Sequence, residues 1–151
     1  MSSLEIIEKH FIKLLAREEY HQLKIDAIKY ALNEKKIEEF FTSIEGYRVL
    51  QWAVNISCDF AALNFLCENV PLKILEKALQ LHKFSILKTF LRDECSVEYD
   101  SDEVDHIFRI EKLKLLLKIG SKCVPEFMQK HQNKKWMTNQ IQKTYQLALH
   151  D

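Results

Sequence analysis

The chain repeats itself about every 25 residues. Pairs of bulky apolar residues recur at this spacing, at Phe40-Phe41, Phe65-Leu66, Phe90-Leu91 and Leu115-Leu116. Ile25, Leu50 and Leu75 keep the same spacing upstream of these pairs. A period of 20 to 50 residues is typical of solenoids, whose units stack on their neighbours and leave a long concave surface. The repeat therefore predicts an array of similar units with a surface suited to binding another macromolecule.

Apolar residues three apart in each period belong on one helix face, so each unit is predicted to be a helix, a short turn and a second helix. Gly46 and Gly120 are expected just after second helices, in a left-handed conformation. In residues 97–121 Asp100 and Glu103 occupy positions that are apolar in other units, so the first helix there is expected to be short or shifted. We predict an all-α solenoid of antiparallel helix pairs forming a single domain, with a cap helix over 1–20, units over 21–46, 47–71, 72–96 and 97–121, and a capping unit over 122–151.

Composition agrees with helices joined by short connections, because 47% of the residues are hydrophobic and only two are Gly and two Pro. The N-terminus has no basic region followed by an apolar run, and no apolar stretch has the length of a bilayer. We therefore expect no secretion signal, no membrane span and a cytoplasmic location. Cys58, Cys67, Cys95 and Cys123 lie on helical patterns without paired spacing, which favours buried thiols in a reducing compartment.

Charge is balanced, at 22 basic and 22 acidic residues, but it is unevenly distributed. Residues 93–105 contain seven acids and no base, whereas 109–143 contain nine Lys or Arg and two acids. Acids at a helix N-terminus interact favourably with the helix dipole, which gives the acidic segment a structural explanation. The alternatives are a patch for a basic partner or a loop phosphorylated at Ser96, Tyr99 or Ser101. The basic stretch is not taken as a nucleic-acid site, because the pI is near 7 and no known motif is present.

The sequence contains no Gly-rich phosphate loop, paired Cys/His metal spacing or nucleophile elbow. Stacking could bring Cys58 near His82, or Cys95 near His106, but such pairs are expected by chance among four cysteines and six histidines. We therefore predict no enzyme activity, no catalytic residue, no metal site and no cofactor.

The segment YRVLQWAVNISCDFAALNFLCEN resembles an ankyrin repeat, with a Leu-x-x-Ala first helix and a second helix that ends in aliphatics. Residues 75–91 and 111–124 resemble further copies, so the resemblance covers about residues 22–124. The usual Thr-Pro opening is absent, and His82 stands where the glycine between helices belongs. A period of 25 instead of about 33 residues removes the β-hairpin finger. The chain is similar to the fingerless ankyrin-like arrays encoded by large DNA viruses and by bacteria that live inside eukaryotic cells.

This resemblance implies that exposed positions of the first helices line a concave binding face. Trp52 is the most informative of them, since tryptophan is enriched at binding hot spots, although packing against a neighbouring unit would also explain it. Arg48 is equally compatible with a simple solvated charge. The predicted partner-binding residues are Trp52, Asn55, Lys77 and Gln80, extended by Tyr47 and Arg48.

The sequence thus predicts a non-enzymatic protein-binding module that captures a host or cellular protein. The resemblance implies a viral or bacterial effector acting in the host cytosol. The pI and the absence of a known motif argue against nucleic acid as a partner. One alternative is a self-associating structural protein, since an imperfectly capped array would bury its end in a homodimer. Another is a small inhibitor or enzyme that acts through the acidic segment 93–105.

Overall fold

The computed structural model describes residues 36–56, 60–100 and 103–150. The chain divides into two compact units, Met1–Leu50 and Gln51–Asp151, and each is described by itself. The cap predicted over 1–20 and most of the repeat unit predicted over 21–46 lie outside the described residues.

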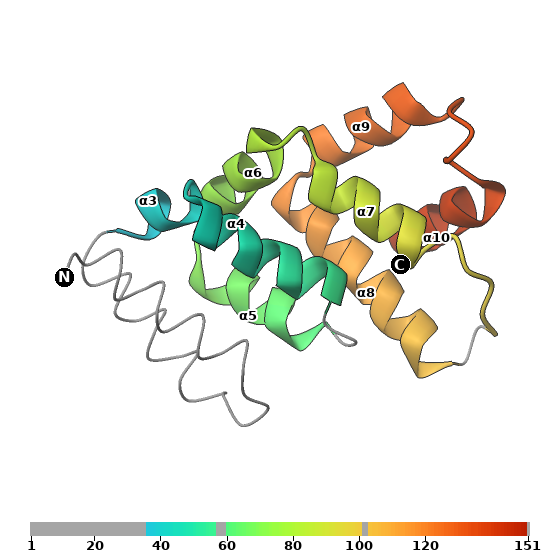
Figure 1. Ribbon diagram of the computed structural model, residues 1–151. Helices are drawn as coiled ribbons and strands as arrows, with labels where there is room; N and C mark the ends of the chain where they lie inside the picture. Colours follow the sequence, from blue (N-terminus) through green and yellow to red (C-terminus); the bar gives the residue numbers. More distant parts are fainter. Residues whose placement is uncertain (1–35, 57–59, 101–102, 151) are drawn as a thin grey trace. The chain divides into compact units, whose positions relative to one another are not determined.

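The described residues form helices and contain no strand, so the all-α class is confirmed (Figure 1). The first unit contains α3 (Ile37–Phe41) and all but the last residue of α4 (Ile44–Gln51). The second unit opens with a π-helical segment, η1 (Trp52–Ile56), which directly continues α4. The helices that follow are α5 (Ala61–Asn69), α6 (Leu72–Leu81), α7 (Ser85–Asp93), α8 (Val104–Ile119), α9 (Cys123–His131) and α10 (Asn139–Leu149).

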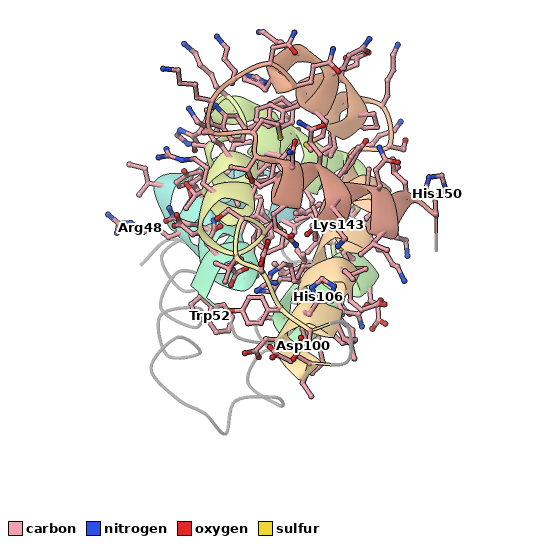
Figure 2. All side chains as sticks on the ribbon, turned by 90° about the vertical axis from the view of Figure 1, so that its right-hand side faces the viewer. Arg48, Trp52, Asp100, His106, Lys143 and His150 are labelled. Atoms are coloured by element: carbon pink, nitrogen blue, oxygen red, sulfur yellow. The ribbon has the colours of Figure 1, made fainter. Side chains whose placement is uncertain are left out.

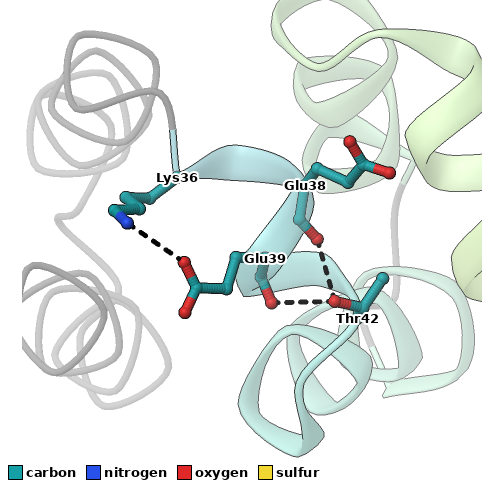
Figure 3. A network of polar contacts seen from close by, with 4 residues as sticks. All are labelled: Lys36, Glu38, Glu39 and Thr42. Carbon is teal, nitrogen blue, oxygen red and sulfur yellow. Dashed lines mark hydrogen bonds and ion pairs between the residues drawn. The ribbon is translucent and has the colours of Figure 1, made fainter.

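In the first unit, α3 is a short helix that ends in two buried aromatic residues. The rings of Phe40 and Phe41 meet edge to face with centroids 5.1 Å apart, and neither ring is exposed. The Thr42 hydroxyl donates to the carbonyl oxygens of Glu38, at 3.1 Å, and Glu39, at 3.0 Å, near the end of the helix (Figure 3). The bond to Glu39 satisfies a backbone acceptor near the helix end, whereas the Glu38 carbonyl also accepts from the backbone N–H of Thr42 at 3.1 Å.

Gly46 lies inside α4 and does not follow a helix as predicted, and its φ is not positive. Its role is close packing, because a Cβ at this position would come within 2.1 Å of the Phe40 carbonyl oxygen and 2.6 Å of the Phe41 Cα. Gly120 does follow a helix, as the C-cap of α8, but its φ of −122° is not left-handed either. The prediction of left-handed glycines is therefore wrong at both positions.

Among the described residues of the second unit, the left-handed conformation occurs in the turn between α6 and α7, at Lys83 and Phe84, with φ of 55° and 60°. Phe84 packs against Phe127 of α9, with ring centroids 5.4 Å apart. Residues with a Cβ rarely adopt a left-handed backbone, which is usually found at glycine. The ring contact of Phe84 therefore helps to stabilise this turn.

Two helices, α6 and α7, lie within residues 72–96, where the repeat predicts a helix, a short turn and a second helix. Their buried residues fall at the repeated positions, including Leu75, Ala78, Leu87, Phe90 and Leu91. The unit predicted over 122–151 also contains two helices, α9 and α10. The finer expectation, a solenoid of stacked antiparallel pairs, stays a prediction.

One continuous helix of 16 residues, α8, stands where the repeat over 97–121 predicts two helices joined by a turn. The stretch between Val104 and Ile119 contains no Gly or Pro, and its Leu, Lys, Glu and Arg residues are good helix formers. Figure 1 shows α8 beside α5, α6 and α10, all of which it contacts. This helix is therefore the central element of the second unit.

Replacing Gly46 with alanine tests the close packing in the first unit. We expect Gly46→Ala to lower the free energy of unfolding by about 1 to 3 kcal/mol, because the new methyl group meets backbone atoms that cannot rotate away. Gly120→Ala is the matched comparison, since its nearest neighbour, at 2.5 Å, is the movable Sγ of Cys123. Urea unfolding followed by circular dichroism measures both, and an equal or larger loss for Gly120→Ala would contradict the assignment.

Candidate functional site

Between Val104 and Lys112, α8 buries basic side chains and exposes apolar ones. His106, Arg109 and Lys112 are 5%, 5% and 2% exposed, whereas Val104 and Ile107 are 59% and 45% exposed. The three buried residues are spaced three apart, so they follow one face of the helix. We call His106, Arg109 and Lys112 the α8 basic row. Charged side chains are almost never fully buried without partners, so each member of the row calls for a physical explanation.

The burial of the Lys112 side chain is explained by its hydrogen bond to η1. Its Nζ donates to the carbonyl oxygen of Val54 at 2.9 Å and lies 3.8 Å from Oε2 of Glu94. The ammonium also lies 5.7 Å from the centre of the Phe90 ring, within the range of a cation–π interaction. These partners replace much of the water that Lys112 loses on burial.

Glu94 belongs to the acidic segment and follows the last residue of α7. Its partial burial raises the pKa of this carboxyl above the ordinary 4.5, while the charges of Lys112 and Arg109 act in the opposite direction. The acidic segment therefore has a structural role at this residue, as the counter-charge of the α8 basic row.

Arg109 is held by an aromatic face, and two of its nitrogens have no acceptor among the described residues. Its guanidinium carbon lies 4.1 Å from the centre of the Tyr99 ring, a stacking arrangement that arginine favours. Its Nε and Nη1 are buried and have no hydrogen-bond partner within the part of the chain that the structure describes. A buried donor without a partner costs about 1 to 3 kcal/mol.

His106 begins the row and faces other positive charges. Burial lowers the pKa of His106 below the ordinary 6.5, and Arg109 and Lys143 of α10 lower it further, while Glu103 raises it (Figure 2). Its Nδ1 is buried and without a hydrogen-bond partner in the described residues. Burial and the neighbouring cations thus favour the neutral imidazole.

A cavity of about 140 Å³ opens beside the row, between the end of α7, the acidic segment and the start of α8. Arg109 and Lys112 supply its buried cations, and Tyr99 and Phe108 supply aromatic surface. Three carboxylates also line it, of which Asp93 and Asp105 are exposed and Glu94 is half-buried. Buried cations and exposed acids therefore occupy one small space.

The residues predicted to bind a partner lie on three helical elements. Tyr47 and the exposed Arg48 lie on α4 in the first unit, and Trp52 and Asn55 lie three residues apart on η1 in the second. Lys77 and Gln80 share the exposed face of α6. Trp52 is partly exposed, whereas the amide atoms of Asn55 are buried and without hydrogen-bond partners in the described residues. Their assignment to one binding face stays a prediction.

Burial weakens the case for a cysteine nucleophile. It raises the pKa of the Cys67 thiol to about 11 and raises the pKa of Cys95 as well. In Cys123 partial burial and the nearby Glu76, whose Oε2 lies 3.7 Å from the thiol, raise the pKa. The reactive form of cysteine is the thiolate, so these three thiols are poorly suited to catalysis near neutral pH. Cys58 lies outside the described residues.

A second, more open groove of about 360 Å³ bears on self-association. It is lined mainly by Leu117, Pro125, Ala148 and Leu149, with Lys114 and Lys118 beside them. Leu149 is 44% exposed. Apolar surface at the end of an array is what a homodimer would cover, but the homodimer stays a prediction.

Within residues 36–56, 60–100 and 103–150, no cluster of three or more His, Cys, Asp or Glu side chains could hold a metal ion. Over the same residues, no helix is long and apolar enough to cross a membrane. Comparison with protein families, curated protein sequences and solved structures gave no match to the chain. The candidate site is therefore argued from its own geometry.

The α8 basic row was not predicted from the sequence. In the sequence, Arg109 and Lys112 stand out only as members of the basic stretch 109–143, and His106 only as a possible neighbour of Cys95. A signal was present, because His106, Arg109 and Lys112 keep helical spacing while Val104 and Ile107 fall on another face. The 25-residue repeat gave no reason to place the polar set on the buried side.

Replacing Lys112 with methionine tests its bond to η1. We expect Lys112→Met to lower the free energy of unfolding by about 3 kcal/mol, because it removes the partner of a buried carbonyl and of Glu94. Lys114→Met is the matched control on the same helix, since Lys114 pairs with the partly exposed Glu111 at 3.0 Å and such pairs contribute about 1 kcal/mol or less. Urea unfolding measures both variants, and equal losses in the free energy of unfolding would contradict a stabilising role for the buried Lys112 bond.

The lowered pKa of His106 predicts a pH dependence of stability. The folded state binds the His106 proton more weakly than the unfolded chain does, so stability is lost as pH falls below 6.5 toward the folded pKa. Each unit of pKa lowering corresponds to about 1.4 kcal/mol. The melting temperature of wild type should therefore fall more steeply on acidification than that of His106→Gln. His150→Gln, at an exposed histidine, should behave like wild type; parallel curves for wild type and His106→Gln would contradict the assignment.

Proposed function

We propose that the chain is a non-enzymatic protein-binding module that holds its partner against Trp52 and the exposed face of α6. The observation that carries this proposal is the exposure of Trp52. This large aromatic side chain is partly exposed, whereas the next two residues, Ala53 and Val54, are fully buried. Tryptophan dominates binding energy at many protein interfaces, where it fills a pocket on the partner.

The backbone that carries Trp52 is firmly held. Ala53 and Val54 are buried, and the Val54 carbonyl accepts the bond from Lys112. A rigid backbone reduces the entropy that a binding residue loses on association. The π-helical geometry of η1 adds support, since π-helical turns are frequent at functional sites.

The α6 face would extend the contact. Leu75, Ala78 and Leu79 bury one side of this helix, while Lys77 and Gln80 are exposed on the other. Leu81, at the end of the helix, is 49% exposed. Polar residues beside exposed apolar surface are typical of the edge of a protein interface.

The partner class is a cellular protein, and the mechanism is steric: the bound partner is recruited or kept from other contacts. The resemblance to viral and bacterial ankyrin-like arrays suggests a protein of a eukaryotic host cytosol as the target. This part of the proposal rests on the resemblance alone.

Parallel capture with wild type, Trp52→Ala and Trp136→Ala tests the proposal. Trp136 is the other tryptophan of the chain and packs against His131 and Phe127 of α9, with ring centroids 5.7 and 6.2 Å apart. We expect Trp52→Ala to weaken binding of the partner about thirtyfold or more, because a hot-spot contact contributes about 2 kcal/mol. Trp136→Ala should bind the partner as wild type does. Mass spectrometry of eluted proteins identifies the partner, and titration with that purified partner gives the affinities.

Circular dichroism must show that both variants remain helical. A folded Trp52→Ala variant that binds the partner as tightly as wild type would refute the role of Trp52. Loss of folding in Trp52→Ala alone would identify Trp52 as a core residue and overturn the proposed face.

A further inference from the structure

The cavity beside the α8 basic row contains buried hydrogen-bond donors that have no acceptor among the described residues. Arg109 lines this cavity, is 5% exposed, and has two buried nitrogens without partners in the described residues. The other buried cation of the lining, Lys112, already donates to the Val54 carbonyl. Among the described residues the two Arg109 nitrogens have no acceptor. A ligand carboxylate would supply one, since it forms strong, charge-assisted bonds with a guanidinium.

The remaining charges of the lining argue against a simple anion. Arg109 and Lys112 face three carboxylates, Asp93, Glu94 and Asp105, so the ionised lining has one negative charge in excess. A ligand with only negative charge would be repelled by the exposed Asp93 and Asp105. A ligand that also carries an ammonium group would turn this repulsion into attraction.

The size and walls of the cavity restrict the ligand further. A volume of about 140 Å³ corresponds to about five water molecules at liquid density, which suits a molecule of a few heavy atoms. Phe108 and the ring of Tyr99 offer apolar surface for one or more methylene groups. Tyr99 also fixes the orientation of the Arg109 guanidinium through its stacking contact.

We propose that this cavity binds a small amino acid, whose carboxylate accepts hydrogen bonds from Arg109 and whose ammonium group faces Asp93 and Asp105. The cavity lining includes none of the residues assigned to the protein-binding face, so each proposal has its own test. The acidic segment gains a second role here, because its exposed carboxylates would select for the positive end of the ligand.

Titration of the full chain with small probes, followed by backbone amide NMR at constant ionic strength, tests the site. The zwitterionic probes are glycine, β-alanine and 4-aminobutyrate, which differ in the distance between their charged groups. Acetate and methylammonium each carry one of the two groups. We expect saturable shifts around Tyr99 and Arg109 with at least one amino acid, in the millimolar range because so small a ligand makes few contacts, and much weaker shifts with acetate or methylammonium.

Three variants assign the two ends of the ligand. Arg109→Gln should weaken binding of the best amino acid by about tenfold or more, the loss of a hydrogen bond to a charged group. Asp105→Asn, at an exposed position that does not endanger the fold, should weaken it about two- to fivefold while strengthening the binding of acetate. Glu126→Gln removes an exposed acid of α9 and should change neither.

Absence of saturable shifts with all three amino acids would overturn the proposal. Acetate that binds wild type as tightly as the amino acids would overturn the role of the carboxylates. If Arg109→Gln does not fold, the Asp105→Asn comparison decides, since equal amino-acid affinities in Asp105→Asn and wild type would place the ligand elsewhere.

Discussion

The second unit depends on one buried hydrogen bond, from the Lys112 ammonium to the Val54 carbonyl at 2.9 Å. A π-helical turn changes the spacing of backbone bonds, and a buried carbonyl without a donor is costly. Lys112 supplies the donor from a helix 58 residues further along the chain. Burial of this charge then requires Glu94 close by, which fixes the end of α7 and the start of the acidic segment relative to α8.

The buried charge of Lys112 has to be compensated by polar groups around it, and His106 and Arg109 on the buried face of α8 are basic as well. Each basic residue on the buried face of α8 has a different environment: Lys112 has acceptors, Arg109 has an aromatic ring, and His106 has a lowered pKa that favours its neutral form. Arg109 has two nitrogens without an acceptor among the described residues, and stacking on Tyr99 does not replace hydrogen bonds. Local rules are most often broken at functional sites, and exposed Val104 and Ile107 beside buried cations break the rule that apolar residues face inward.

The 25-residue repeat predicted the helical class and the burial of the apolar residues that recur at that spacing. Leu50, Leu75, Phe90 and Leu91 are all fully buried, as the spacing implied. Periodicity misjudged Gly46, because close approach to the Phe40 carbonyl depends on a neighbouring helix and leaves no mark in the repeat. It also could not predict the α8 basic row, since the burial of a charge depends on partners such as Val54 and Tyr99 that lie far away in sequence.

The bond between η1 and α8 also has a consequence for how the protein is made. In a simple repeat array each new unit completes the surface of the one before it, so a growing chain can fold unit by unit as it leaves the ribosome. Here Val54 is synthesised long before Lys112, and its carbonyl has no lysine donor until α8 emerges. The segment from η1 to α7 must therefore wait, incompletely packed, until α8 has been made as far as Lys112, and a nascent chain stalled before that point would be a natural substrate for chaperones.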